Sequence, residues 1–196
     1  MSWLQKYIER WGEMITAYRW RSFFIALVFM VGVALLMRPS SSCLVTPYTP
    51  LAIVDLELAF NPTRAQLITR VWEQSVCQNS FALSDTALEA AIINIIIDFA
   101  FLKTYTWFFI VLIFLSASGQ RKHFTYALVY LALLAGLMDV VENIAMLVFI
   151  ADPSDFTYGF AVPAAIKFGL ILIVILLVII RSILRLVRSF SSRSSS

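Results

Sequence analysis

Three polar residues stand inside an otherwise apolar stretch of the sequence, from Phe124 to Ala151. Asp139 and Glu142 are three positions apart, and Asp139 and Asn143 are four apart, so a helix places all three on one face. Carboxyl and amide groups are costly within a membrane-spanning helix and normally face protein or water. Such a group of carboxyls can take up protons, or it can hold a cation through its oxygen atoms.

Polar residues also interrupt the neighbouring apolar stretches. Counted at about 1.5 Å per residue from the expected helix ends, they fall at similar depth in the outer half of the membrane. The expected cluster consists of Asn94, Asp98, Asp139, Glu142, Asn143 and Lys167. It could pair internally and fix the packing of the helices without any chemistry, or it could carry protons or a cation. Lys103 lies more than a turn beyond Asp98 on another face, and we expect it to extend toward the cytoplasm.

The sequence lacks the residues that several kinds of catalytic site require. The chain has one histidine, His123, and contains no P-loop, dinucleotide fingerprint, His-Glu-x-x-His or Cys-x-x-Cys sequence. This removes histidine-rich metal sites and a serine–histidine triad, although a Ser–Lys or carboxylate mechanism stays open. We therefore predict no catalytic residue, no metal site and no cofactor.

Composition indicates an integral membrane protein. Of the 196 residues, 61% are hydrophobic and 14% are charged, whereas a soluble domain has about 25% charged residues. The net charge of +3 is spread along the chain, which argues against nucleic-acid binding. The predicted partners are the lipid bilayer and, as further candidates, another membrane protein or a second copy of the chain.

Four apolar segments predict an all-α, integral membrane four-helix bundle in one domain, residues 1–188. The predicted spans are residues 21–37, 88–116, 124–150 and 160–181. The first could instead be a signal peptide, but no Ala-x-Ala-like site follows it, so we expect an uncleaved span. Pro39 and the serines after it are predicted to end the first helix. The Ser/Arg tail, 189–196, is predicted to be disordered.

The segments outside the spans also show patterns. Residues 1–20 predict an amphipathic helix in the membrane interface; packing on another protein is the alternative. Asn61-Pro62 predicts the start of a short helix over 62–77, and residues 51–60 could form a strand or a helical turn. Thr86 and Glu89 fit a capping box that opens the second span.

Lysine and arginine residues predict the orientation. Ten of the fifteen lie before the first span, between the second and third, or after the fourth, whereas three lie in the 38–87 segment. By the positive-inside rule, both termini are cytoplasmic and the 38–87 loop is extracytoplasmic. Cys43 and Cys77 both fall in that loop, where two cysteines can form a disulfide; two unpaired thiols are the alternative.

A further set of residues resembles a known group of proteins. The order is Leu56-Glu57-Leu58-Ala59, Trp72, Asp98-Phe99-Ala100-Phe101-Leu102 with Tyr105, Gly136-x-x-Asp139-x-x-Glu142-Asn143, and Lys167. This order resembles a group of uncharacterised bacterial four-span membrane proteins, over most of residues 51–170. The resemblance implies the fold and a bacterial origin, hence the inner (plasma) membrane, and it adds Glu57 to the candidate site.

Three functions follow as hypotheses. The first is a non-enzymatic membrane component that binds a partner or lipid, with the polar residues specifying the fold. The second is a small ion- or proton-coupled transport element, although four spans are few for a lone transporter and no repeat is visible. The third is an intramembrane enzyme that uses its carboxylates on a lipid, which would need a nucleophile or a metal.

Overall fold

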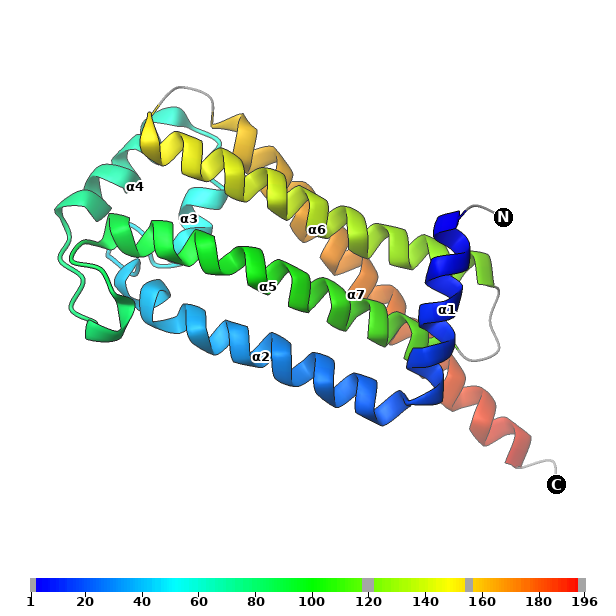
Figure 1. The fold of residues 1–196 in the computed structure, drawn as a ribbon. Helices are drawn as coiled ribbons and strands as arrows, with labels where there is room; N and C mark the ends of the chain where they lie inside the picture. The colour runs from blue at the N-terminus through cyan, green and yellow to red at the C-terminus, as the bar shows by residue number, and fades with distance from the viewer. Residues whose placement is uncertain (1–2, 118–121, 154–156, 194–196) are drawn as a thin grey trace.

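Four long helices form the body of the protein in this computed structural model, which describes residues 3–117, 122–153 and 157–193. The long helices are α2 (Arg19–Cys43), α5 (Ala87–Ser116), α6 (Lys122–Ala151) and α7 (Tyr158–Arg193) (Figure 1). Each has a stretch that is long and apolar enough to cross a membrane. They pack in the order α2, α5, α6, α7, so α5 and α6 form the middle of the bundle.

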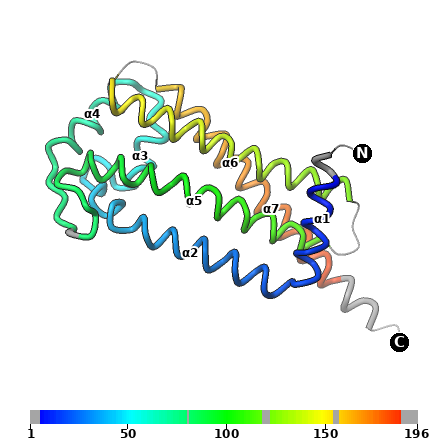
Figure 2. Tube along the Cα trace, in the orientation of Figure 1, coloured from blue at the N-terminus to red at the C-terminus, as the bar shows by residue number. Residues whose placement is uncertain are grey.

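Short helices cover the two ends of the bundle. Helix α1 (Trp3–Ala17) crosses one end, and α3 (Ile53–Glu57) and α4 (Pro62–Gln74) cover the other (Figures 1 and 2). Ile8 and Ile15 of α1 are buried against the bundle, while Trp11 is partly exposed. The start of α1 and the end of α7 both lie at this end of the bundle, as the predicted placement of both on one side of a membrane requires.

Helix α2 is longer than the sequence suggested. The prediction that Pro39 ends the first helix is wrong, because α2 continues through it to Cys43. Proline removes one backbone hydrogen bond, but serine hydroxyls bond to carbonyls in the same turns. Ser40 Oγ donates to the Met37 carbonyl at 2.9 Å, and Ser42 Oγ donates to the Pro39 carbonyl at 2.7 Å. These bonds hold the last two turns of α2, although neither reaches the Leu35 carbonyl, which would have accepted from an amide at position 39.

The predicted helix starts are confirmed. Asn61 caps α4 by accepting from the Thr63 amide at 2.9 Å, and Thr86 and Glu89 form the capping box of α5. Helix α4 ends at Gln74, three residues earlier than predicted. Of the two alternatives for residues 51–60, the structure has the helical turn, α3.

The end of α7 differs from the prediction. Helix α7 continues to Arg193, so the predicted disorder of residues 189–193 is wrong; residues 194–196 lie outside the described residues. Adding a residue to a helix that has already formed costs little free energy, which explains the extension.

The sulfur atoms of Cys43 and Cys77 lie at disulfide distance, with their Cα atoms 5.1 Å apart, and they join the end of α2 to the segment after α4.

Candidate functional site

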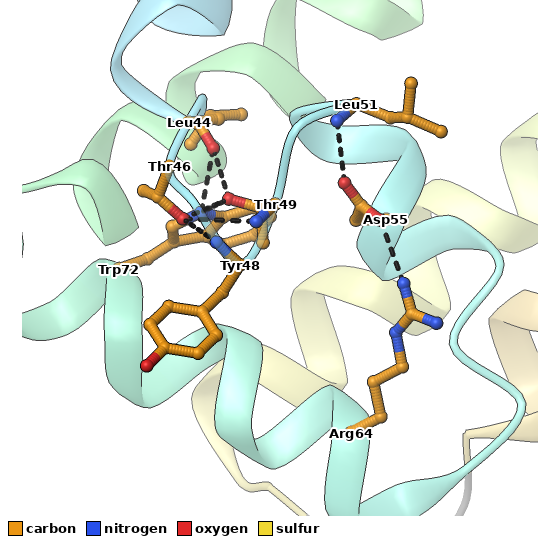
Figure 3. Close-up of polar contacts among 8 residues, drawn as sticks. All are labelled: Leu44, Thr46, Tyr48, Thr49, Leu51, Asp55, Arg64 and Trp72. Carbon is orange, nitrogen blue, oxygen red and sulfur yellow. Dashed lines mark hydrogen bonds and ion pairs between the residues drawn. The ribbon is translucent and has the colours of Figure 1, made fainter.

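A buried tryptophan holds the loop that leads into α3. Trp72 on α4 is fully buried, and its Nε1 donates to the Leu44 carbonyl at 3.1 Å and to Thr49 Oγ1 at 3.2 Å (Figure 3). Thr49 Oγ1 in turn donates to the same Leu44 carbonyl at 2.6 Å. Buried polar groups need such partners, so this network gives the loop one preferred path between α2 and α3.

A carboxylate then fixes the first turn of α3. Asp55 accepts from the Leu51 amide at 2.7 Å and from Arg64 Nη2 at 2.9 Å (Figure 3). Ala52, just before the helix, has a φ of 56°, a left-handed conformation that non-glycine residues seldom adopt. The loop therefore starts α3 at a defined angle, and Glu57 at its end is buried at 7% exposure.

Lys167 on α7 is the centre of the buried polar residues. Its Nζ lies 2.9 Å from Asp139 Oδ1 and 2.9 Å from Glu142 Oε1, both on α6. Glu57 Oε2 approaches the same nitrogen at 3.6 Å from α3. The four side chains are between 0% and 10% exposed. The lysine thus connects α3, α6 and α7 through ion pairs that are shielded from solvent.

Two more hydrogen bonds join α5 to this group. The Tyr105 hydroxyl donates to Asp139 Oδ2 at 2.8 Å, and Asn143 Nδ2 donates to Asp98 Oδ2 at 2.7 Å. We use the name polar cluster for the residues that these contacts connect or place side by side. They are Glu57, Asp98, Tyr105, Asp139, Glu142, Asn143 and Lys167.

Asn94 does not join the polar cluster, in contrast to the expectation from helix depth. Its Nδ2 donates to Ser40 Oγ at 2.9 Å and to Ser41 Oγ at 2.8 Å. Asn94 lies one turn before Asp98, close to where the serine-rich end of α2 packs on α5. Its amide therefore ties α5 to α2, while Asp98 bonds to α6.

Tyr105 was absent from the predicted site. It is seven residues after Asp98, a spacing of two turns that places both on one face of α5. The tyrosine was visible in the sequence only as part of the resemblance, because an aromatic residue in an apolar helix is ordinarily a packing residue. What identifies it as part of the cluster is its hydroxyl bond to Asp139.

The charges of the polar cluster do not balance. The polar cluster contains four carboxyl groups and one lysine, which pairs with three of them, so full ionisation would leave an excess of three negative charges in a buried place. Such an excess is costly, and protonation of some carboxyls removes it. Burial raises the pKa of Glu57, Lys167 lowers it in part, and the Asp139 charge raises it further. The Lys167 ammonium occupies the place between the carboxylates where a bound cation would lie.

A separate apolar groove lies between α1, α5 and α6, in the half of the bundle nearer α1. Its volume is about 580 Å³, within the range of about 300–1,000 Å³ that is usual for ligand sites. Its walls are apolar or aromatic, apart from Lys103 and Thr106. The lining residues are Tyr7, Ile8, Trp11, Leu102, Lys103, Thr106, Trp107, Ile110, Phe114, Val129, Leu133, Gly136, Leu137 and Val140.

Close contact between α5 and α6 shapes the inner wall of the groove. A Cβ atom on Gly136 would lie 2.7 Å from Thr106 Oγ1, so glycine leaves this hydroxyl its space. The Thr106 hydroxyl is buried, with no hydrogen-bond partner within the described residues. Buried polar atoms of this kind call for an explanation, and rotation of the Thr106 side chain would turn the hydroxyl into the groove. The sequence contained two signs of this groove: Gly136 within the third apolar segment and Lys103 within the second.

Comparisons with protein-family models, curated proteins and solved structures gave no match for this chain. Its function must therefore be inferred from the polar cluster and the apolar groove. The polar cluster is closed and internally paired, which suits it to hold helices together. The groove is open to the outside of the bundle and has walls suited to a hydrocarbon chain.

Proposed function

We propose that the protein is a non-enzymatic, multi-pass component of a bacterial inner membrane that binds a lipid-like molecule in the apolar groove. Four apolar helices support the membrane location, and the resemblance noted in the sequence supports the bacterial origin. The single observation that carries the binding role is the groove of about 580 Å³, with a partly exposed surface on α1, α5 and α6. Both termini and α1 would then lie on the cytoplasmic side.

The polar cluster has a supporting role in this proposal. It connects α3, α5, α6 and α7 through the short contacts of Lys167, Tyr105 and Asn143. Lipid tails provide no hydrophobic force between apolar helices, so polar contacts and close packing must determine how the helices associate. By holding α5 against α6 just beyond the groove, through Tyr105 and Asp139, the cluster maintains the two walls between which the groove lies.

Filling the groove tests the proposal. Leu133 and Leu137 line it and are 40% and 54% exposed, so phenylalanine at both positions should occupy the space without disturbing the core. In lipid nanodiscs, the double variant should bind radiolabelled hexadecanol at least tenfold more weakly than the native protein. The matched control changes Leu172 and Leu176 on α7, which are 56% and 49% exposed, and should bind normally. Equal binding by all three proteins would refute the proposal.

The excess of carboxyl groups supports a second candidate function. Four acids in a cluster with one lysine can exchange protons, and a proton-coupled transport element is the function that would use them. In vesicles that enclose a pH-sensitive dye, the native protein should then move protons, and Glu142→Gln should abolish this. An intact gradient in vesicles with the native protein would leave the cluster with its structural role alone.

A further inference from the structure

Lys103 has an unusual position among the charged residues of α5. It lies thirteen residues before the helix ends at Ser116, which is about 20 Å along the axis. Its side chain is exposed and lines the groove. Within the described residues, no carboxylate forms an ion pair with it. An ionisable side chain within a spanning helix indicates a functional site, for which an oppositely charged partner should be sought.

We infer that the partner of Lys103 is the carboxylate of a free, single-chain fatty acid whose hydrocarbon chain lies in the apolar groove. The inference rests on the proposed lipid-binding function and specifies its ligand. Lys103 provides the positive charge, and the groove walls provide apolar contact for one chain. A fatty acid gives its carboxyl proton to water at the membrane surface and binds as the carboxylate, which forms an ion pair with the Lys103 ammonium.

The position of α1 decides how the chain is oriented. Lys103 lies toward the middle of the bundle, while Tyr7, Ile8 and Trp11 of α1 line the opposite end of the groove. The carboxylate at Lys103 therefore directs the chain toward α1, which closes that end. A phospholipid fits poorly, because its phosphate stays at the membrane surface, about 20 Å from Lys103 by the same count. A spanning helix of another protein would meet α1, which crosses its path (Figure 1).

Thr106 lines the groove beside Lys103. It follows Lys103 by three residues, so the two side chains lie on neighbouring positions of one helix face. Its hydroxyl is buried next to Gly136 and has no partner within the described residues. A carboxylate has two oxygen atoms and accepts several hydrogen bonds, so one ligand at Lys103 would also accept from Thr106 once rotation of the threonine side chain turns its hydroxyl into the groove.

Binding of two chains that differ only in the head group tests the inference. The full-length protein in phosphatidylcholine nanodiscs is titrated with radiolabelled palmitate and with radiolabelled hexadecanol. Lys103→Met should weaken palmitate binding about tenfold, the factor of one charge-assisted hydrogen bond, and leave hexadecanol binding unchanged. Lys103→Arg should retain most of the palmitate affinity. Lys6→Met removes the same charge from α1, outside the groove, and should change neither affinity.

The outcomes separate the inference from the function on which it rests. If Lys103→Met binds palmitate like the native protein while both bind hexadecanol, the groove is real and the carboxylate assignment is wrong. If neither chain binds the native protein, the proposed function itself fails. A larger native complex that Lys103→Met loses, with palmitate binding unaffected, would overturn the inference in favour of a partner helix with a carboxylate. Should Lys103→Met unfold, Lys103→Gln replaces it, and unfolding by circular dichroism verifies each variant.

Discussion

Replacing Lys167 with methionine tests the role of the polar cluster most directly. The substitution keeps a long apolar side chain but removes the ammonium that lies 2.9 Å from both Asp139 and Glu142. Asp139 keeps the Tyr105 hydroxyl as a donor, whereas Glu142, at 0% exposure, makes its hydrogen bond to Lys167. Glu142 is therefore the group that the substitution harms most.

The size of the effect follows from these two ion pairs. Removing one partner of a buried ion pair costs about 3–5 kcal/mol in soluble proteins, while polar couplings within membranes reach about 1.7 kcal/mol. Because the substitution removes both short ion pairs of the ammonium, we expect Lys167→Met to lower the free energy of unfolding by about 2–3 kcal/mol. Adding Glu142→Gln should restore about 1 kcal/mol, because the amide needs no counter-charge.

Unfolding of the detergent-solubilised protein in increasing SDS, followed by circular dichroism, measures both effects. Lys103→Met is the matched control, since its lysine also lies within an apolar helix but pairs with no carboxylate in the described part of the chain. It should change stability by less than about 0.5 kcal/mol. If the losses from Lys167→Met and Glu142→Gln are strictly additive, the two side chains do not interact and the assigned geometry is wrong.

Three other predictions concern Glu57, the cysteine pair and the orientation of the chain in the membrane. Burial raises the pKa of Glu57 above its ordinary value of 4.5. The folded state therefore keeps this proton at pH values where the unfolded state has lost it, and the free energy of unfolding decreases as the pH rises above 4.5. Glu57→Gln should flatten this pH dependence, and Glu73→Gln, at an exposed position, should preserve it. If Cys43 and Cys77 form a disulfide, a thiol-reactive mass tag should label the denatured protein only after reduction, and the double serine variant should lose a few kcal/mol of stability; complete labelling without reductant would contradict the bridge. Reporter fusions at the C-terminus and between α5 and α6 should report the cytoplasm, and one at Asn79 should report the opposite side; a cytoplasmic signal there would reverse the proposed orientation.

The sequence by itself determined the helical class and the positions of the long apolar helices, because these depend on local composition and periodicity. The capping residues Asn61 and Thr86 predicted their helix starts for the same reason: each cap acts on amides two or three residues away. Polar residues in apolar helices also showed that some buried pairing must occur, because the cost of leaving them in lipid is high.

The tertiary structure alone decided which of these polar groups meet. Helix depth placed Asn94 with Asp98, but the packing of α2 on α5 gave Asn94 its serine partners instead. The buried end of α3 depends on Trp72 and Asp55, whose partners are residues in separate parts of the loop. The groove is a surface shared by three helices, and Lys103 becomes a candidate ligand-binding residue only when α1 and α6 are placed beside it. Contacts between segments far apart in the chain depend on the shapes of all the side chains between them, and no local pattern encodes those shapes.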